Sequence, residues 1–324
     1  YQENIFAAYF NITRDWEQWS LDLGLRAEQT EVRATSKNLG EVNNQYYFEL
    51  FPKMSLLYTA NENNSFGLSY SRSIARPNYE SLNPFRYFIN ENNYTDGNPN
   101  LVPEIDSKYT FSYTHNNTWF LEAYYWHIKN PLEELRFQNN TTRALQNLET
   151  NLIKGYQYSL DVTYAKSVTS WWYLQVVTSG FFIENEFLAQ QSAQQTALAN
   201  TYGFYGQIYS GLVLSEQANI TSDVTALYIS NLIFGSYTYK NQFNLSASVR
   251  KKIWDKKASI TLGVDDIFNT NNIPVVSRYA NQDNGYFART ESRLFRVGFT
   301  YNFGNSKLRD NNREITTKES DRLN

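Results

Sequence analysis

The chain holds few side chains whose types and spacing could support catalysis. Its two histidines, His115 in a predicted turn and His127 near a predicted strand end, are too few and too far separated for a metal site or a triad. Asp265 and Asp266 are adjacent in a predicted strand, so they face opposite sides and cannot form an acid–base pair. Phosphate-loop and dinucleotide fingerprints are absent from the sequence. The sequence therefore predicts a protein that is not an enzyme, with no cofactor and no metal.

The charged side chains alternate instead with apolar ones. The segment 293–303 shows the pattern most clearly, because Phe295, Val297, Phe299, Tyr301 and Phe303 alternate with polar or small residues. Successive side chains of a strand point to opposite faces, so this period of two predicts a strand with one apolar and one wet face. The same pattern recurs at 20–28, 66–71, 109–113, 156–164, 220–228, 243–250 and 258–265. We expect a hydrated interior lined by Asp22, Arg26, Glu122, Asp161, Asp223, Arg250 and Arg296.

Composition is compatible with a membrane protein that crosses by strands. The 324 residues have a mean hydropathy of -0.57, and no apolar run approaches the ~18 residues of a spanning helix. A transmembrane barrel escapes that test because its lipid-facing and interior residues alternate. The 26 Tyr and 7 Trp suit membrane–water interfaces. A net charge of -3 without a basic block argues against nucleic acid, and the lack of cysteine leaves the redox compartment open.

Short polar turns alternate with longer polar segments along the chain. The turns fall near 14–17, 61–64, 115–117, 166–169, 215–219 and 254–257, and the long loops near 35–44, 76–104, 130–151, 185–202, 231–240 and 269–290. This asymmetry is typical of outer-membrane barrels, with short periplasmic turns and long extracellular loops. About thirteen strands are predicted in residues 1–304, and residues 305–324 are predicted to be a polar periplasmic tail. If Phe303 ends at the periplasmic rim, the first strand runs downward, so we expect the chain to start in mid-barrel.

One loop carries a dense motif. It contains Arg76-Pro77 and Leu82-Asn83-Pro84-Phe85, and then Gly97-Asn98-Pro99 and Pro103-Glu104 ahead of a strand at 106–114. Proline pre-sets φ and glycine supplies positive φ, so we expect this motif to fix a loop that re-enters the barrel wall, with substrate contact as the alternative. These segments, with Asp265–Thr270 and Tyr301–Gly304, resemble TonB-dependent receptors, in particular the outer-membrane β-barrel family abundant in Bacteroidota.

The resemblance implies an all-β fold in which this chain forms the last thirteen strands of a 22-stranded antiparallel transmembrane β-barrel in the bacterial outer membrane. It implies import of a scarce nutrient such as a siderophore, cofactor or glycan. Nothing in the sequence matches the family's plug domain or its TonB-engaging segment, so contact with the TonB complex is expected through a missing N-terminal region. The other implied partners are outer-membrane lipid, the barrel-assembly machinery and a surface lipoprotein. The alternatives are a plugless barrel that serves as a structural or assembly subunit, and a soluble β-rich adhesin.

Two further sets of residues are candidates for contacts with partners. The first is an aromatic and Asn-rich loop that we expect to touch substrate, formed by Tyr87, Phe88, Asn90, Asn92, Asn93 and Tyr94. The second resembles the signal that barrel-assembly machinery recognises, formed by Val297, Phe299, Tyr301 and Phe303. The simpler interpretation of the second set is that these side chains only face lipid, and both interpretations can hold together.

Overall fold

The computed structural model describes residues 2–36, 41–189, 195–287 and 289–303. The elements in these residues are β-strands. Nowhere in these ranges is there a helix with the length and apolar character needed to cross a membrane. The predicted polar tail at 305–324 lies outside the described residues.

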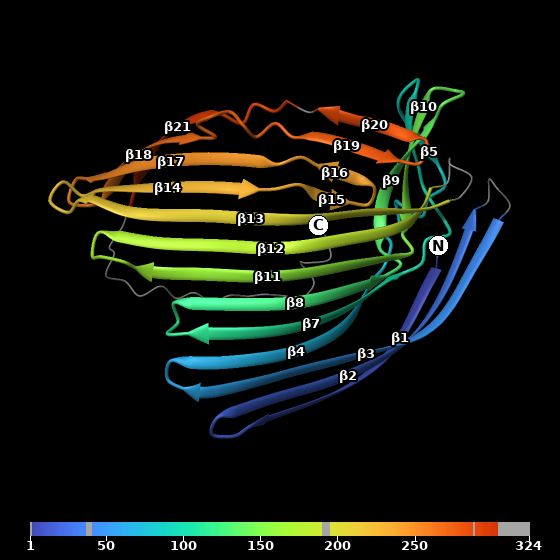
Figure 1. Ribbon diagram of the computed structural model, residues 1–324, viewed down its shortest axis with the longest axis horizontal. Coiled ribbons are helices and arrows are strands. Elements are labelled where there is room, and N and C mark those ends of the chain that lie inside the picture. Colours follow the sequence, from blue (N-terminus) through green and yellow to red (C-terminus); the bar gives the residue numbers. More distant parts are fainter. Residues whose placement is uncertain (1, 37–40, 190–194, 288, 304–324) are drawn as a thin grey trace.

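Thirteen antiparallel strands form one large curved sheet, which we call the wall (Figure 1). Its strands follow chain order: β1 (Gln2–Asp15), β2 (Trp19–Ser36), β3 (Glu41–Asn61), β4 (Asn64–Ala75), β7 (Glu104–His115), β8 (Trp119–Lys129), β11 (Lys154–Ser167), β12 (Trp172–Ala189), β13 (Gln195–Ser215), β14 (Ile220–Ile229), β17 (Gln242–Ile253), β18 (Ala258–Asp265) and β21 (Leu294–Tyr301). The predicted strand number is therefore confirmed. Among the described residues, β1 pairs only with β2, and β21 pairs only with β18.

Four of the predicted long loops contain strands of their own, which the sequence pattern did not predict. The first cap sheet contains β5 (Arg86–Asn90), β6 (Asn93–Asp96), β10 (Ala144–Asn151) and β9 (Leu132–Asn139). The second cap sheet contains β15 (Leu232–Phe234), β16 (Tyr237–Tyr239), β19 (Pro274–Tyr279) and β20 (Gln282–Phe287). The loops predicted at 35–44 and 185–202 are mostly extensions of β2, β3, β12 and β13. We call the two small sheets together the cap.

The two faces of the wall differ as the alternation predicts. On the apolar face, Leu68, Leu160 and Ile208 are each about half exposed, as expected for side chains whose solvent is lipid. On the polar face, Asp161 accepts a hydrogen bond from Ser159 Oγ at 2.6 Å. Asp223 accepts one from the Tyr209 hydroxyl at 2.5 Å. These two carboxylates of the polar face thus accept hydrogen bonds from hydroxyl groups within the wall.

A row of aromatic rings crosses six neighbouring strands on the apolar face. Ring centroids of consecutive members lie 4.6 to 6.2 Å apart, through Tyr70, Tyr109, Tyr125, Tyr158, Phe182 and Tyr202. These residues are direct cross-strand partners, each opposite the next in the ladder. Aromatic cross-strand pairs of this kind stabilise a sheet by roughly 0.2–1 kcal/mol each.

A buried apolar cluster lies where the first cap sheet meets the wall. Leu135, Phe137, Leu152 and Phe187 are each 1% exposed and pack together. Leu135 and Phe137 come from β9, whereas Phe187 comes from the extended end of β12. The first cap sheet is therefore fastened to the wall by its own small core, at the end of the strands away from the short turns (Figure 1).

Candidate functional site

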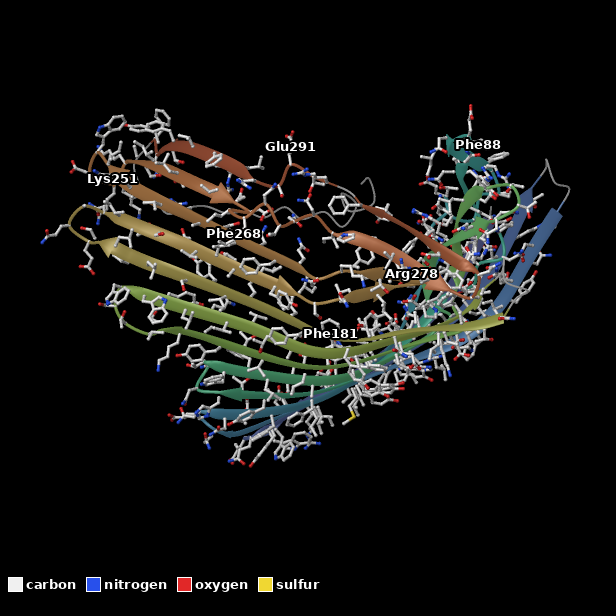
Figure 2. The ribbon with its side chains drawn as sticks, turned by 45° about the horizontal axis from the view of Figure 1, so that its top comes forward. Phe88, Phe181, Lys251, Phe268, Arg278 and Glu291 are labelled. Atoms are coloured by element: carbon white, nitrogen blue, oxygen red, sulfur yellow. The ribbon has the colours of Figure 1, made fainter. Side chains whose placement is uncertain are left out.

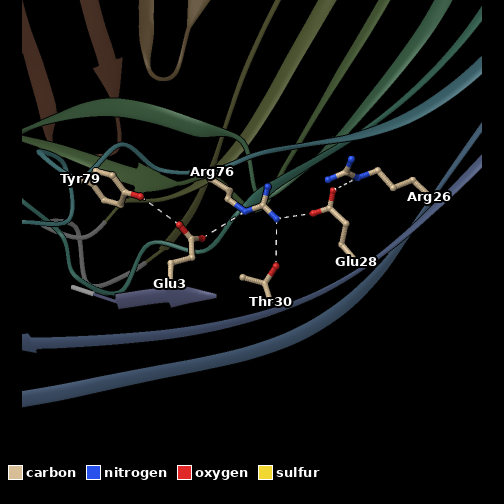
Figure 3. Close-up of polar contacts among 6 residues, drawn as sticks. All are labelled: Glu3, Arg26, Glu28, Thr30, Arg76 and Tyr79. Carbon is tan, nitrogen blue, oxygen red and sulfur yellow. Dashed lines mark hydrogen bonds and ion pairs between the residues drawn. The ribbon is translucent and has the colours of Figure 1, made fainter. Parts of the chain in front are cut away.

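Arg76, directly after β4, lies in an ion-pair network with β1 and β2 (Figure 3). Its Nη2 lies 2.7 Å from Glu28 Oε2 and donates to Thr30 Oγ1 at 3.2 Å. Its Nε lies 3.5 Å from Glu3 Oε1. Glu28 is only 4% exposed, and a buried carboxylate is tolerated only when cations and donors surround it. Arg76 therefore joins the motif loop to the β1–β2 hairpin.

The rest of the motif packs against the β2–β3 hairpin. Asn43 Nδ2 donates to Pro99 O at 2.6 Å, and Gln45 Nε2 donates to Leu101 O at 3.0 Å. The gap left at this contact is only ≈ 20 Å³, and the motif residues that line it are Arg76, Pro77, Leu82, Pro99, Leu101 and Pro103. This contact is thus closed by the protein's own side chains.

Gly97 is required by close approach and not by backbone handedness. A Cβ at this position would lie 1.8 Å from Asn83 O, because Asn98 N–H donates to Ser81 O at 2.6 Å and draws the two segments together. The expected positive φ was wrong: among the described glycines only Gly235 adopts it, at 53°. Glu104 completes the motif by accepting a hydrogen bond from Leu132 N–H at 2.8 Å. Substrate contact by the motif stays a prediction.

The predicted contact loop is the β5–β6 hairpin at the tip of the first cap sheet, where Figure 2 labels Phe88. Tyr87 and Phe88 are 54% and 67% exposed. The asparagines instead build the hairpin. Asn90 Oδ1 accepts from Asn92 N–H at 2.9 Å, and Asn93 Oδ1 accepts from Asn147 Nδ2 at 2.8 Å. The structure thus divides this loop into an exposed aromatic edge and a structural turn.

Beside this hairpin the first cap sheet carries a cavity of ≈ 650 Å³, which we call the bowl. Arg86 binds Asp96 through two hydrogen bonds, Nε to Oδ1 and Nη2 to Oδ2, each 2.8 Å long. Gln146 Nε2 donates to the same Oδ2 at 2.9 Å. The complete lining is Pro84, Arg86, Asp96, Gly97, Asn98, Gln146 and Leu148.

The sequence prediction included Pro84, Gly97 and Asn98 but missed Arg86, Asp96 and Gln146. The sequence does contain a signal for Arg86 and Asp96. They lie equally far from the Asn-rich turn, so a hairpin would place them opposite each other. The register confirms that geometry, because Arg86 faces Asp96. Gln146 reaches the bowl through the parallel pairing of β10 with β6, which no local pattern indicates.

The two cap sheets contact each other through β9 and β20. Gln138 and Gln282 exchange two hydrogen bonds, and the Tyr279 hydroxyl donates to Arg136 O at 3.2 Å. The Arg136 guanidinium lies 5.3 Å and 5.4 Å from the ring centroids of Tyr237 and Tyr286. Nearby, burial together with the charges of Glu104 and Glu149 raises the pKa of Glu133 to about 7.

The predicted assembly signal forms β21 and the two residues after it. Val297 and Phe303 are 80% and 89% exposed, whereas Phe299 and Tyr301 have their rings against Trp254 at 5.9 and 6.0 Å. Val297, Phe299 and Tyr301 lie on β21, whose one described neighbour is β18. Their recognition by assembly machinery stays a prediction.

His115, Asp265 and Asp266 each contact neighbouring polar groups of the protein. His115 Nδ1 and Nε2 lie 2.8 and 2.9 Å from polar atoms of Asn64 and Asn116. Asp265 pairs with Arg296 at 2.6 Å. Asp266 is fully buried and accepts from Thr270 and Asn271 backbone N–H groups at 3.0 Å. Across the described ranges, no group of three or more His, Cys, Asp or Glu side chains could hold a metal ion.

Several solved structures of outer-membrane proteins share the fold of the wall. Fiu, a ferric-catecholate import receptor of E. coli K12, matches at 14% identity with a TM-score of 0.59, over 93% of this chain and 45% of the receptor. PiuA, a siderophore receptor of Acinetobacter baumannii, matches at 14% identity and 0.59, over 91% and 43%. The copper transporter OprC matches at 11% identity and 0.64, over 93% and 48%.

The chain thus spans less than half the length of these proteins. At such identities the likeness concerns the fold, which is an all-β wall matching about half of a TonB-dependent receptor barrel. No curated protein matches the sequence significantly. The model of the outer membrane protein beta-barrel family matches residues 1–301. The chain therefore belongs to the outer membrane protein beta-barrel family, a non-enzymatic class of the bacterial outer membrane.

Proposed function

We propose that this chain is the C-terminal part of the barrel of a TonB-dependent receptor that imports a scarce nutrient, namely a siderophore, a cofactor or a glycan. The wall is the scaffold in lipid, and the cap is the extracellular surface that selects substrate. The plug and the TonB-engaging segment belong to the rest of the polypeptide.

The observation that carries this proposal is the match of the wall to import receptors over 91–93% of this chain. The polar face offers a hydrated interior, and the cap adds a cavity and an exposed aromatic edge above it. Loops held on a rigid scaffold are where binding residues concentrate.

Uptake by the full-length receptor tests the proposal. Cells that carry the receptor should accumulate a labelled ferric siderophore, cobalamin or oligosaccharide only when TonB is present, and deletion of residues 87–94 should abolish uptake while the barrel still assembles. Unchanged uptake after the deletion would contradict the contact loop. Uptake of none of these, or uptake without TonB, would contradict import.

The alternative, a plugless barrel within an outer-membrane complex, is separated from import by the parent reading frame. A plug-encoding segment upstream of Tyr1 supports import. A signal peptide immediately before Tyr1 supports the plugless subunit instead.

A further inference from the structure

We propose that the bowl of the first cap sheet binds a neutral, polyhydroxylated ring, that is, a carbohydrate. The inference rests on the import function proposed above and deepens it by selecting the glycan among the three substrate classes.

Charge is the first reason. Arg86 and Asp96 are the charged side chains of the lining, and their two 2.8 Å hydrogen bonds neutralise them against each other. The Asp96 side chain is only 14% exposed, so an anion that drew Arg86 away would leave a largely buried carboxylate without its cation. The bowl therefore disfavours anions such as ferric catecholates and accepts a neutral ligand.

Hydrogen-bonding capacity is the second reason. The pair with Asp96 uses Nε and Nη2 of Arg86, so Nη1 is available to donate. Gln146 binds Asp96 through Nε2, which leaves its Oε1 to accept. A sugar hydroxyl can both donate and accept a hydrogen bond. Neighbouring hydroxyls of a sugar therefore suit the lining of the bowl, which presents a donor on Arg86 and an acceptor on Gln146.

The aromatic edge is the third reason. Phe88 and Tyr94 are cross-strand partners two residues along from Arg86 and Asp96, so all four side chains share one face of the sheet. The Arg86 guanidinium lies over the Tyr94 ring, 3.9 Å from its centroid, whereas the Phe88 side chain is 67% exposed on this same face, next to the lining of the bowl. The C–H face of a sugar ring is apolar and would pack on the Phe88 ring. The volume of ≈ 650 Å³ lies within the roughly 300–1,000 Å³ typical of small-molecule sites.

Binding by the purified full-length receptor in detergent micelles tests this inference. The probes are a panel of neutral oligosaccharides (glucans, mannans and galactans) and, as the anionic probe, a ferric tris-catecholate complex. Calorimetry should show binding of at least one neutral oligosaccharide. Arg86→Gln, Gln146→Met and Phe88→Ala should each weaken it about tenfold, since each removes a hydrogen bond or a stacking contact with the sugar.

The second cap sheet provides matched controls. Arg278 and Asp283 form a cross-strand pair at 2.9 Å whose side chains are 70% and 73% exposed, and Phe287 is 60% exposed. Arg278→Gln and Phe287→Ala repeat the chemical changes outside the bowl and should leave the affinity unchanged. Asp96→Asn should strengthen binding of the ferric complex, because it releases the charge of Arg86.

Three outcomes would overturn the carbohydrate site. One is binding of no neutral oligosaccharide, and another is an affinity that the bowl variants do not alter. The third is binding of the ferric complex by the unmodified receptor that is lost in Arg86→Gln. TonB-dependent uptake that persists in the bowl variants refutes the bowl alone, whereas uptake that never depends on TonB refutes import itself.

Discussion

The side-chain amide of Gln282 forms two hydrogen bonds with the backbone of Gln138, as a neighbouring strand would. Gln138 N–H donates to Gln282 Oε1 at 2.5 Å, and Gln282 Nε2 donates to Gln138 O at 3.0 Å, across 144 residues of sequence. Gln282 is 3% exposed, so both bonds are shielded from water. The amide of one side chain thus replaces a pair of backbone hydrogen bonds between strands and joins the two cap sheets.

Gln282→Leu should open the contact between the cap sheets. The change leaves the N–H and C=O of Gln138 without partners, at a cost of about 1–3 kcal/mol for each group that stays buried. Hydrogen exchange by mass spectrometry should show faster exchange in β9 and β20 with the wall unaffected. Gln217→Leu, in an exposed turn of the wall, is the control. Equal exchange in both variants would show that the cap sheets hold together without this pair.

Gly97→Ala should displace the motif loop, because its Cβ would lie 1.8 Å from Asn83 O. We expect a loss of roughly 2–4 kcal/mol in the free energy of unfolding and new protease cleavage within residues 76–103. Gly180→Ala provides the control, since a Cβ there meets no atom within 4 Å. A loop that stays protected in Gly97→Ala would refute the close-approach explanation.

Arg76→Met should destabilise the wall near β1 and β2. It removes a cation from Glu28, which is 4% exposed, and breaking a buried pair costs about 3 kcal/mol. Urea unfolding of the receptor in micelles measures the change. Arg278→Met removes an exposed cation and should change stability by no more than about 0.5 kcal/mol. If the two variants unfolded alike, the network around Arg76 would be energetically unimportant.

Stability of the first cap sheet should fall as the pH rises through about 7. Burial and the neighbouring Glu104 and Glu149 raise the pKa of Glu133 from 4.5 to about 7, so the folded cap binds a proton that the unfolded chain releases. This contribution is fully present below pH 4.5 and is lost as the pH rises through about 7, by about 1–3 kcal/mol.

Hydrogen exchange of β9 and β10 at pH 6 and pH 8, corrected for intrinsic rates, measures this dependence. Glu133→Gln should remove it and slow exchange at pH 8. Glu134→Gln, the adjacent side chain on the other face of β9, should leave it in place. A cap whose stability is the same at both pH values would contradict the prediction.

Phe303→Gln should lower the amount of assembled barrel. Phe303 is 89% exposed, and burying a phenylalanine against a partner is worth about 1.5–3 kcal/mol. The heat-modifiable fraction in outer membranes should fall several-fold. Phe287→Gln, in the cap, should not change it. Equal assembly of both variants would leave Phe303 only a lipid-facing role.

The wall could be predicted from sequence because a period of two, repeated between lipid and water, constrains every strand locally. Leu68 and Ser69 alone show which way β4 faces. The cap could not be predicted in this way. Its strands are as short as three residues, and β10 pairs in parallel with β6 across about fifty residues of chain. Gln146 enters the bowl through that pairing, so its role depends on contacts that only the folded chain brings together.

The motif residues could likewise be recognised in the sequence, whereas their contacts could not be predicted from it. Gly97 stood out in the sequence, but its physical reason lies in Asn83, fourteen positions earlier, which comes into contact only when the loop closes on itself. Arg76 also stood out, yet its partners Glu3 and Glu28 lie in strands whose distance to the loop could not be predicted from the sequence.

The row of rings on the apolar face has a consequence for how the wall finds its alignment. Alternation alone rejects a slip of one residue, which would turn an oily face toward water, but a slip of two residues keeps every face correct. Between β11 and β12 such a slip would set Tyr158 opposite Gly180 or Glu184 in place of Phe182. The rings therefore penalise a slip of two residues, which the alternation of apolar and polar side chains does not penalise.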